Sequence, residues 1–230
     1  MRYVIFKKHK KKYLYFISDQ VIDYSCTIID KKLKRIAAKY YQDFLKNNIV
    51  DIIKTAIERL IASHPELKKK ITTRGVGFQI HFGNWKKNCN KYYEIKDSRF
   101  LAAKIFFLQT KFIWDLISDV IKRDFPEEWK QLQQKIKLDN LSYFFGIWEC
   151  LAINYRFQSN PHIDTHDIKN GICVIIPIGN FTGGNINIHD FRISLAAKER
   201  GIVVLKSSYY LHSNDPVVGD RDSIVLFTAV

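Results

Sequence analysis

Short apolar segments recur at regular intervals after Leu141, and this spacing constrains the fold more than any other feature of the chain. Gly, Pro, Asn and Asp separate the segments, and these residues favour turns. The segments cover residues 151–157, 172–178, 185–188, 191–195, 202–206, 209–212 and 223–230. Short strands at intervals of about eight to twelve residues are typical of an all-β sandwich or barrel. We therefore predict a β-core for residues 141–230.

The first 140 residues predict a hairpin and helices instead. β-forming residues at 3–6 and 13–17 flank a lysine-rich run, which predicts two strands joined by a turn. From Asp30 to about His64, apolar residues recur at helical spacing, so we predict one or two amphipathic helices, broken near Asn47. We also predict a strand at 76–82, a polar aromatic loop at 84–93 and a helix from about Ser98 to Asp124.

The two halves are expected to fold together. No Pro-, Gly- or Ser-rich linker separates them, so we predict a single α+β domain over residues 1–230. In this prediction, residues 1–140 form a basic support of helices and a hairpin, and residues 141–230 form the catalytic β-core. No G-x-G-x-x-G or P-loop motif occurs in the sequence, which excludes the nucleotide-binding loops that those motifs form.

The chain is strongly basic, and the excess is confined to its first half. It has 37 Lys and Arg against 23 Asp and Glu, a formal net charge of +14. Residues 1–90 hold 20 basic and 7 acidic residues, residues 91–150 hold 10 and 9, and residues 151–230 hold 7 of each. A positive field of this kind attracts polyanions. The hydrophobic fraction of 47% excludes a disordered chain, so a folded domain presents this charge.

The cysteines and the N-terminus favour an intracellular, soluble protein, and the nucleus is compatible with the charge. Four cysteines are widely spaced without a C-x-x-C pair, so neither a zinc knuckle nor a disulfide framework is predicted. The N-terminus lacks the apolar core of a signal peptide. The longest nearly uncharged stretch, residues 171–189, is interrupted by Pro177 and Gly179 and is not expected to cross a membrane.

His162 and Asp164 form the most informative pair in the sequence. In an extended strand, side chains two residues apart point to the same face, so the imidazole and the carboxylate would lie side by side. Two histidines and one carboxylate on one face of a metal ion are diagnostic of non-heme Fe(II) oxygenases. His212, at the end of a strand-like run, is the natural second histidine. His166 shares a face with Asp164 and competes with His162 for this role.

Arg221 and Ser223 follow His212 at a spacing that suits the binding of an acidic co-substrate. Turn residues between Asn214 and Gly219 would fold the Arg221 strand back beside the His212 strand. Arg221 and Ser223, two residues apart, would then share a face near the metal. A guanidinium fork and a hydroxyl together suit the distal carboxylate of a dicarboxylic acid.

The order His-x-Asp, distal His and Arg-x-Ser within a run of short strands resembles the Fe(II)/2-oxoglutarate-dependent dioxygenases, whose core is a double-stranded β-helix, or jelly roll. The resemblance covers roughly residues 151–230. The segments HIDTHD (162–167), IIPIGNFTGG (175–184), HSN (212–214) and RDSIV (221–225) look like the TET/JBP-type oxygenase domains, in particular their small fungal and protist forms. The cysteine-rich region of the animal TET proteins is missing, and residues 1–140 show no matching motif.

The resemblance implies a mechanism and a set of catalytic residues. His162, Asp164 and His212 would bind Fe(II), and 2-oxoglutarate would chelate the iron through its keto-acid end. Arg221 and Ser223 would hold the far carboxylate of this co-substrate, and O2 would be the oxidant. The reaction expected for the family is oxidation of the methyl group of a pyrimidine base.

Asn154 and Arg156 are further residues that could contact the keto-acid end of 2-oxoglutarate. They lie on the strand that precedes the metal pair. The alternative is that one is a surface polar residue and the other a structural ion-pair partner.

A basic aromatic segment before the β-core could bind nucleic acid. Aromatic rings stack on bases, and lysines contact phosphates. The segment contains Trp85, Lys86, Lys87, Lys91, Tyr92 and Tyr93. A basic loop with partly buried aromatic side chains explains the same residues equally well, and so both interpretations stay open.

Three functions remain compatible with the sequence. The first is a dioxygenase that oxidises a methylated pyrimidine in DNA, flipping the base out of the duplex to reach it. The second is a dioxygenase that hydroxylates a protein side chain or a small metabolite, because an acidic substrate would explain the charge as well. The third is an inactive barrel that only binds. No obligate protein partner is predicted.

Overall fold

The computed structural model describes residues 2–6, 18–69, 75–86, 92–94, 100–139 and 145–230. The helices are α1 (Asn47–Ser63), α2 (Leu101–Asp124) and α3 (Pro126–Asp139). The first strands are β1 (Arg2–Phe6), β2 (Gln20–Ile22), β3 (Cys26–Asp30), β4 (Arg35–Tyr41), β5 (Gly75–Lys86) and β6 (Tyr92–Glu94). The later strands are β7 (Cys150–Ser159), β8 (Cys173–Ile178), β9 (Phe181–Gly183), β10 (Ile186–Ile188), β11 (Ile193–Leu195), β12 (Ile202–Leu205), β13 (His212–Asn214), β14 (Val217–Gly219) and β15 (Asp222–Phe227).

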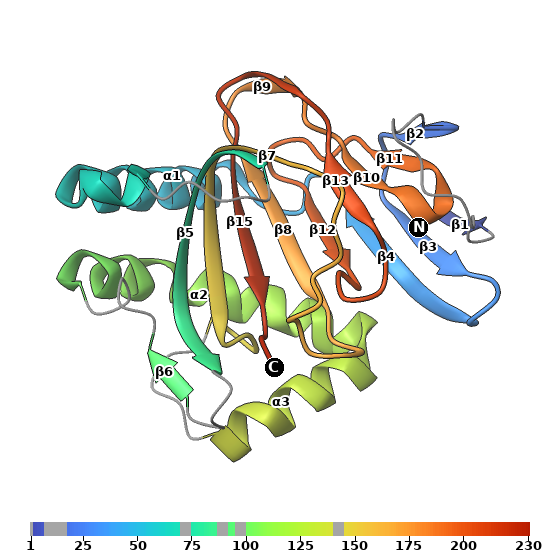
Figure 1. Cartoon of the computed structure of the whole chain (residues 1–230), viewed down its shortest axis with the longest axis horizontal. Helices are drawn as coiled ribbons and strands as arrows, with labels where there is room; N and C mark the ends of the chain where they lie inside the picture. The colour runs from blue at the N-terminus through green and yellow to red at the C-terminus, as the bar shows by residue number, and fades with distance from the viewer. Residues whose placement is uncertain (1, 7–17, 70–74, 87–91, 95–99, 140–144) are drawn as a thin grey trace.

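The strands form two facing sheets and a short ribbon (Figure 1). The larger sheet has nine strands in the order β1-β3-β4-β12-β8-β15-β7-β5-β6, and the smaller sheet has four in the order β13-β10-β11-β2. The ribbon pairs β9 with β14. This mixed α+β architecture, with two sheets of mainly antiparallel strands, agrees with the predicted jelly-roll class. Strands from both halves of the chain lie in the larger sheet.

β8, in the middle of the larger sheet, is buried on both faces. Val174 and Ile176 point into the core shared with the helices, whereas Cys173 and Ile175 point into the core between the two sheets. Because the side chains on both faces are buried, both must be apolar. The sequence of β8 is therefore a continuous apolar run and does not alternate between apolar and polar residues. The same division of side chains along β15 gives the sheet two apolar faces.

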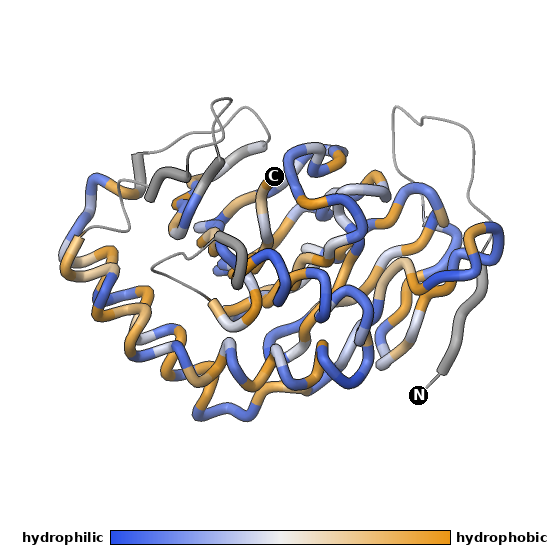
Figure 2. The backbone as a smooth tube through the Cα atoms, turned by 90° about the horizontal axis from the view of Figure 1, so that it is seen from below, coloured by the Kyte–Doolittle hydropathy of each residue, from blue (hydrophilic) through white to orange (hydrophobic). Residues whose placement is uncertain are grey.

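The helices cover the face of the larger sheet that is turned away from the smaller sheet (Figures 1 and 2). Ile53, Ile57 and Leu60 of α1 are buried at the three- and four-residue spacing that puts them on one side of a helix. α2 ends at Asp124, as predicted, because Pro126 lacks the N–H that would continue it and instead begins α3. No helix in the described part of the chain has the length and apolarity needed to cross a membrane.

The helix predicted after Asp30 is wrong for its first part, where β3 and β4 form a hairpin. Asp30 Oδ1 accepts hydrogen bonds from the N–H groups of Lys32 and Leu33, and Lys34 has a φ of 50°, so the backbone turns sharply there. β4 lies between β3 and β12, and it is buried on both faces. A strand of this kind lacks strict alternation, which is why its pattern also matched a helix. The helix begins only at Asn47.

Other local predictions also change. β1 pairs in parallel with β3, and its predicted hairpin partner at 13–17 lies outside the described residues. α3 was not predicted, since its sequence is rich in Gln, Glu and Lys and has only a weak apolar stripe. The strand predicted at 209–212 begins only at His212, as β13. The residues before it form a turn, in which Tyr209 N–H donates to Lys206 O. β9 and β14, with only three residues each, were missed.

Asp124 ties the end of α2 to β4, and we predict that Asp124→Asn destabilises the protein. Its Oδ2 is 2.7 Å from Lys39 Nζ and 2.6 Å from Tyr41 OH, and Arg123 Nε donates to Oδ1. Without the carboxylate, the buried Lys39 ammonium has lost its counter-ion, and we expect the free energy of unfolding to fall by about 3 kcal/mol. Urea denaturation at pH 7 measures this loss. The exposed Asp115→Asn, which breaks a surface pair with Lys111, should change stability by less than about 0.5 kcal/mol.

The effect of Asp124→Asn should depend on pH. The hydrogen bond from Arg123, together with Lys39 and Tyr41, holds the pKa of Asp124 below its usual range despite partial burial. A carboxyl group with a lowered folded-state pKa stabilises the protein above its unfolded pKa of about 4, and this stability is lost as the pH falls further. The stability difference between the wild type and Asp124→Asn should therefore narrow below pH 4. A difference that stays constant from pH 7 to pH 3 would contradict this assignment.

Candidate active site

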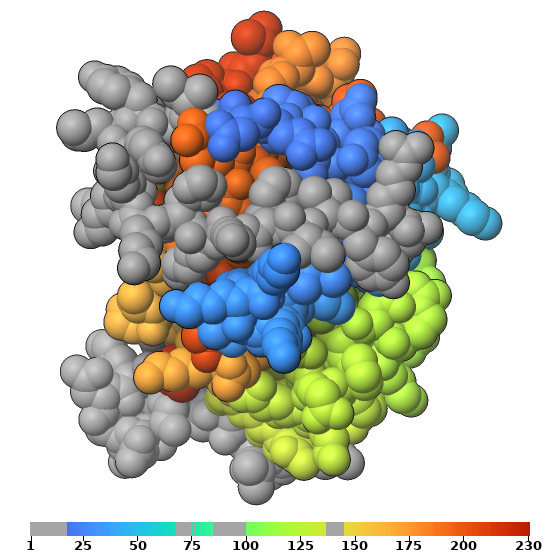
Figure 3. Space-filling model, turned by 90° about the vertical axis from the view of Figure 1, so that its right-hand side faces the viewer, coloured from blue at the N-terminus to red at the C-terminus, as the bar shows by residue number. Residues whose placement is uncertain are grey.

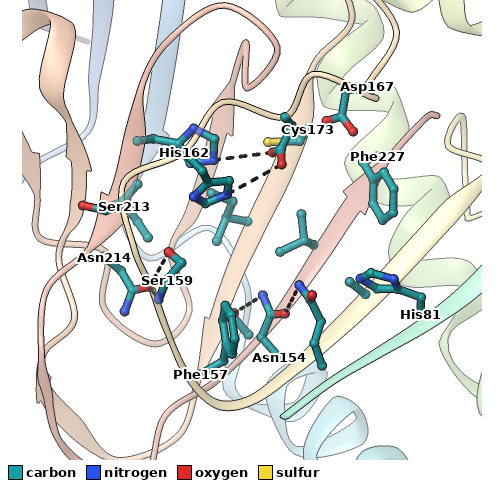
Figure 4. A pocket seen from close by; sticks show the side chains of 18 of the residues that line it. His81, Asn154, Phe157, Ser159, His162, Asp167, Cys173, Ser213, Asn214 and Phe227 are labelled. Carbon is teal, nitrogen blue, oxygen red and sulfur yellow. Dashed lines mark hydrogen bonds and ion pairs between the residues drawn. The ribbon is translucent and has the colours of Figure 1, made fainter. Parts of the chain in front are cut away.

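A cavity of about 440 Å³ lies between the larger sheet and the strands β10 and β13 of the smaller sheet (Figure 4). Side chains of β5, β7, β8 and β15 form one wall, and the segment after β7 closes the cavity from another side. Figure 4 shows His81 and Phe227 together on one side of the pocket, with Ser159 and Asn214 on the other. The cavity therefore has distinct sides, each built from different strands.

The wall formed by the larger sheet has a polar row and an apolar row. Gln79 on β5 pairs with Asn154 on β7, which pairs in turn with Ser223 on β15. Two residues along the same strands, the next row of cavity-facing positions holds His81, Ala152 and Val225. Rows two residues apart face the same side of a sheet, which explains why both rows reach the cavity.

A backbone bridge brings His162 and His212 together. The N–H of each residue donates to the carbonyl oxygen of the other at 2.9 Å, so the segment that follows β7 is joined to β13. The two imidazole rings consequently lie with their centroids 4.3 Å apart. Two histidines from distant parts of the sequence thus meet at one edge of the cavity.

Both imidazoles are oriented by backbone carbonyls. His162 Nδ1 is 2.7 Å from Asn160 O, and His212 Nδ1 is 3.0 Å from Tyr210 O. A carbonyl oxygen only accepts, so each Nδ1 carries the hydrogen and each Nε2 can offer a lone pair. Hydrogen bonds of this type hold metal-binding histidines in the correct tautomer.

Asp164 completes a group of three side chains that could hold a metal ion. Its Oδ1 is 3.6 Å from His162 Nε2, and its Oδ2 is 3.5 Å from His212 Nε2. The donor atoms of the three residues all lie within 4.8 Å of one another. Burial of His212 opposes its protonation, but the hydrogen bond and charge of Asp164 outweigh burial and raise the His212 pKa. A metal ion at this position would compete with a proton for His212 Nε2. His166 is exposed, lines the cavity and does not belong to this group.

Arg221 presents a buried positive charge to the same cavity. The residue is 3% exposed, and its Nε and Nη2 atoms have no hydrogen-bond partner among the described residues. Its guanidinium carbon lies 5.5 Å from the centre of the Phe181 ring on β9. Burial lowers the Arg221 pKa to about 10, so the side chain remains charged at neutral pH. A buried cation with unsatisfied donors favours an anionic ligand.

The path of the chain to Arg221 differs from the prediction. Arg221 and Ser223 do reach the cavity together, but their strand does not lie beside β13. β14 intervenes and pairs with β9, and β15 then enters the larger sheet between β7 and β8. The guanidinium and the histidines therefore approach the cavity from different sheets.

Asn154 lies in the cavity, whereas Arg156 lies outside it, which corrects the prediction for Arg156. Arg156 has a φ of 46°, and the pairing of β5 with β7 shifts register opposite it, between Val76 and Phe78. This bulge breaks the alternation of side chains along β7, so Arg156 does not face the cavity as Asn154 does. The Arg156 side chain is 59% exposed and forms an ion pair with Asp220 at 2.5 Å. Arg156 thus matches the alternative interpretation of a structural ion-pair partner.

The predicted nucleic-acid-binding segment is a pair of strands rather than a loop, as far as it is described. Trp85 and Lys86 belong to β5, and Tyr92 and Tyr93 belong to β6. Trp85 pairs with Tyr93 and Lys86 with Tyr92 across this antiparallel pair, at the edge of the larger sheet. Lys87 and Lys91 lie outside the described residues.

The cavity contains further groups that the sequence pattern did not select. Gln79, His81, Asp167 and Phe227 all line it. Asp167 Oδ2 accepts a hydrogen bond of 2.7 Å from Ser207, and the Phe227 ring is 6.0 Å from the ring of His81. Gln79 and His81 belong to the first half of the chain, where no motif indicated a contribution to the site.

The chain matches the Tet/JBP family model, which describes an oxygenase domain of the 2-oxoglutarate and Fe(II)-dependent dioxygenase superfamily. The match covers residues 90–229, more than half of the chain, and this range includes His162, Asp164, His212 and Arg221. The chain belongs to the Tet/JBP family. As a Tet/JBP oxygenase domain, it is a dioxygenase that depends on Fe(II), 2-oxoglutarate and O2.

This Tet/JBP domain is similar in sequence to one characterised enzyme and in fold to one solved structure. Thymine dioxygenase JBP1 of Leishmania braziliensis is 31% identical over 105 residues, which is 45% of this chain but only 12% of JBP1. The solved structure of NgTET1 in complex with 5mC DNA superposes with a TM-score of 0.70 at 16% identity. That superposition covers 98% of this chain and 82% of NgTET1, and it shows that the two share a fold.

The residues in the cavity of this Tet/JBP domain fit both the metal and the co-substrate. Two imidazoles with available Nε2 atoms and one carboxylate are the donor set that Fe(II) takes in non-heme oxygenases. The unsatisfied, buried Arg221 guanidinium fits the distal carboxylate of 2-oxoglutarate. The cavity lies between these groups and contains both.

Asn214 supports the segment that carries His162, and we predict that Asn214→Ala weakens metal binding. Its Oδ1 accepts hydrogen bonds from Ser159 N–H at 2.7 Å and Ser159 Oγ at 2.8 Å, which ties β13 to the start of this segment. Direct partners of metal ligands are worth 10- to 100-fold in metal affinity, and Asn214 acts one step further out, so we expect a loss of up to about 10-fold. Titration with Mn(II) measures the affinity, and an unchanged value in the folded variant would contradict this role.

Proposed function

We propose that this chain oxidises the methyl group of a 5-methylpyrimidine base in DNA. The observation that carries the proposal is the arrangement within one cavity of a His-Asp-His donor group and a buried guanidinium without partners. In this proposal His162, Asp164 and His212 bind Fe(II), and Arg221 and Ser223 bind the far carboxylate of 2-oxoglutarate.

Each of these side chains has a definite task. His162 and His212 keep their Nε2 lone pairs toward the metal because Asn160 O and Tyr210 O hold the Nδ1 hydrogens. With three protein ligands, an iron ion held here would keep open positions for the co-substrate and oxygen. When bound, iron and 2-oxoglutarate supply the oxidising chemistry that converts a C–H bond into C–OH.

The co-substrate end of the cavity is shielded from water. Arg221 is buried, and Phe181 lies over its guanidinium. An ion pair is stronger in such a water-excluded position than on the surface, so Arg221 would fix the direction in which 2-oxoglutarate lies. The keto-acid end would then point toward the metal-binding group. Asn154, in the same polar row, lies beside Ser223 and would face the co-substrate.

The similar proteins support a DNA base as the substrate. JBP1 is a thymine dioxygenase, and the NgTET1 structure holds DNA with 5mC. Thymine and 5-methylcytosine share a methyl group on C5 of a pyrimidine ring, which defines the substrate class that we propose. The base would have to be flipped out of the duplex, because a methyl group inside the stack cannot reach a cavity between two sheets.

The charge of the chain supports the same partner. The net charge of +14 provides the electrostatic attraction on which DNA binding depends. The turn between β3 and β4 exposes Lys31, Lys32 and Lys34. This region, in blue, lies beside the yellow-green helices on the face seen in Figure 3. We propose that this basic surface and the β5–β6 pair contact the phosphates that flank the flipped base, and that the protein acts in the nucleus.

Product analysis tests this function directly. The purified protein is incubated with Fe(II), 2-oxoglutarate and duplex DNA that contains thymine and 5-methylcytosine, and the nucleosides are then measured by mass spectrometry. We expect hydroxymethylpyrimidine that depends on added 2-oxoglutarate. DNA without 5-methylcytosine shows which of the two bases is used. Turnover of 2-oxoglutarate with a peptide or a metabolite, but never with DNA, would overturn the substrate and leave the dioxygenase activity in place.

A further inference from the structure

Gln79, from the first half of the chain, is hydrogen-bonded to Asn154, the cavity residue that would face the co-substrate. Gln79 Nε2 donates to Asn154 Oδ1 at 2.8 Å, and Asn154 Nδ2 donates to Ser223 Oγ at 3.3 Å. The three residues occupy paired positions on β5, β7 and β15, and all line the cavity. This series of two hydrogen bonds therefore ends at the Ser223 hydroxyl, which lies in the same cavity as Arg221.

The direction of these hydrogen bonds determines what Ser223 can offer. An amide has a donor end and an acceptor end, so donation by Gln79 to Asn154 Oδ1 turns the Asn154 NH2 group toward Ser223. Ser223 Oγ then accepts, and its own hydrogen is left to donate into the cavity. In the opposite direction, Ser223 would donate to Asn154 and present only lone pairs to the co-substrate.

We propose that Gln79 is a positioning residue that sets Ser223 as a hydrogen-bond donor and so makes this end of the cavity select a carboxylate. Arg221 also has only donors, and two of its nitrogen atoms are buried without partners. With Ser223 donating, both groups that face the distal end of the ligand require an acceptor. A carboxylate satisfies both, whereas an amide at the same position would direct its NH2 group at a donor. The inference rests on the proposed binding of 2-oxoglutarate by Arg221 and Ser223.

Gln79→Glu tests this role because it keeps the shape of the side chain and removes its donor. A carboxylate at position 79 can only accept, so Asn154 must turn its NH2 group toward it and its oxygen toward Ser223. Ser223 then donates to Asn154 and faces the co-substrate with a lone pair. We expect the dissociation constant of 2-oxoglutarate to rise about tenfold, as for the loss of one hydrogen bond to a charged group.

The measurement is calorimetric titration of the Mn(II)-loaded protein with 2-oxoglutarate under argon, where no turnover occurs. A double-mutant cycle combines Gln79→Glu with Ser223→Ala. If Gln79 acts through the Ser223 hydroxyl, the double variant should bind 2-oxoglutarate no more weakly than Ser223→Ala alone. The amide analogue 2-oxoglutaramate is a second probe, and its disadvantage relative to 2-oxoglutarate should shrink in Gln79→Glu.

A matched control separates this effect from that of an added negative charge. Gln158→Glu makes the same substitution on β7, at a residue that does not line the cavity, and should bind 2-oxoglutarate like the wild type. Wild-type affinity in Gln79→Glu, or fully additive effects in the cycle, would overturn the role of Gln79 alone. A wild-type protein that binds Mn(II) but not 2-oxoglutarate would overturn the proposed co-substrate site as well. Equal Mn(II) affinity across the variants excludes a general disruption of the cavity.

Discussion

Replacement of Asp164 by Ala is expected to abolish metal binding and, with it, all oxidation of DNA bases. Asp164 is the carboxylate between the two imidazoles, 3.6 Å from His162 Nε2 and 3.5 Å from His212 Nε2. Supporting residues around a metal already account for 10- to 100-fold in affinity, so loss of a direct ligand should cost more than about 100-fold. Without Asp164, the two histidines also lose the negative charge that offsets a dication.

Titration with Mn(II) under argon measures the metal affinity, and mass spectrometry of the DNA measures the product. His166→Ala is the matched control, because His166 lines the cavity without belonging to the group of three. It should retain the metal, whereas His162→Ala should lose it. Loss of the metal in His166→Ala and retention in His162→Ala would show that the other histidine of the HIDTHD segment is the ligand.

Arg221→Met should weaken the binding of 2-oxoglutarate and raise the stability of the ligand-free protein. Removal of one partner of a buried, hydrogen-bonded charge pair costs about 2 to 5 kcal/mol, so 2-oxoglutarate affinity should fall at least about 30-fold. The ligand-free protein should become more stable by about 1 kcal/mol or more. A buried guanidinium with unsatisfied nitrogen atoms is costly, and the similar-sized Met removes that cost.

Calorimetry with the Mn(II)-loaded protein and urea denaturation of the metal-free protein measure the two effects. A stabilised variant that no longer binds 2-oxoglutarate is the combination expected of a residue kept for function at the expense of stability. A variant that loses stability instead would show that Arg221 supports the fold, and unchanged affinity would show that the carboxylate is bound elsewhere. Ser223→Ala provides a milder comparison, because it removes a hydroxyl and no charge.

The grouping of the candidate site residues at one cavity could be predicted from the sequence because the motifs are short and extended. Residues 162 and 164 need only a period of two to share a face, and the same holds for Arg221 and Ser223. Arg156 shows the limit of this reasoning. A bulge with a positive φ broke the period between Asn154 and Arg156, and no residue in the sequence marked its position.

The helix predicted in place of β4 has a physical explanation. β4 is a central strand with two buried faces, so burial removed the alternation that distinguishes a strand from a helix. Gln79 was missed for a different reason, since an isolated Gln on a strand carries no pattern. Its role follows only from its pairing with Asn154, a long-range contact.

The sequence by itself determined the family, the β-rich second half and the candidate set of His162, Asp164, His212 and Arg221. These depend on local spacing, which a chain retains before it folds. Only the tertiary structure decided how the groups meet. The bridge between His162 and His212, the entry of β15 between β7 and β8, and the polar row that begins at Gln79 arise from pairing between distant strands. Such pairings depend on the packing of whole sheets, and local spacing does not encode them.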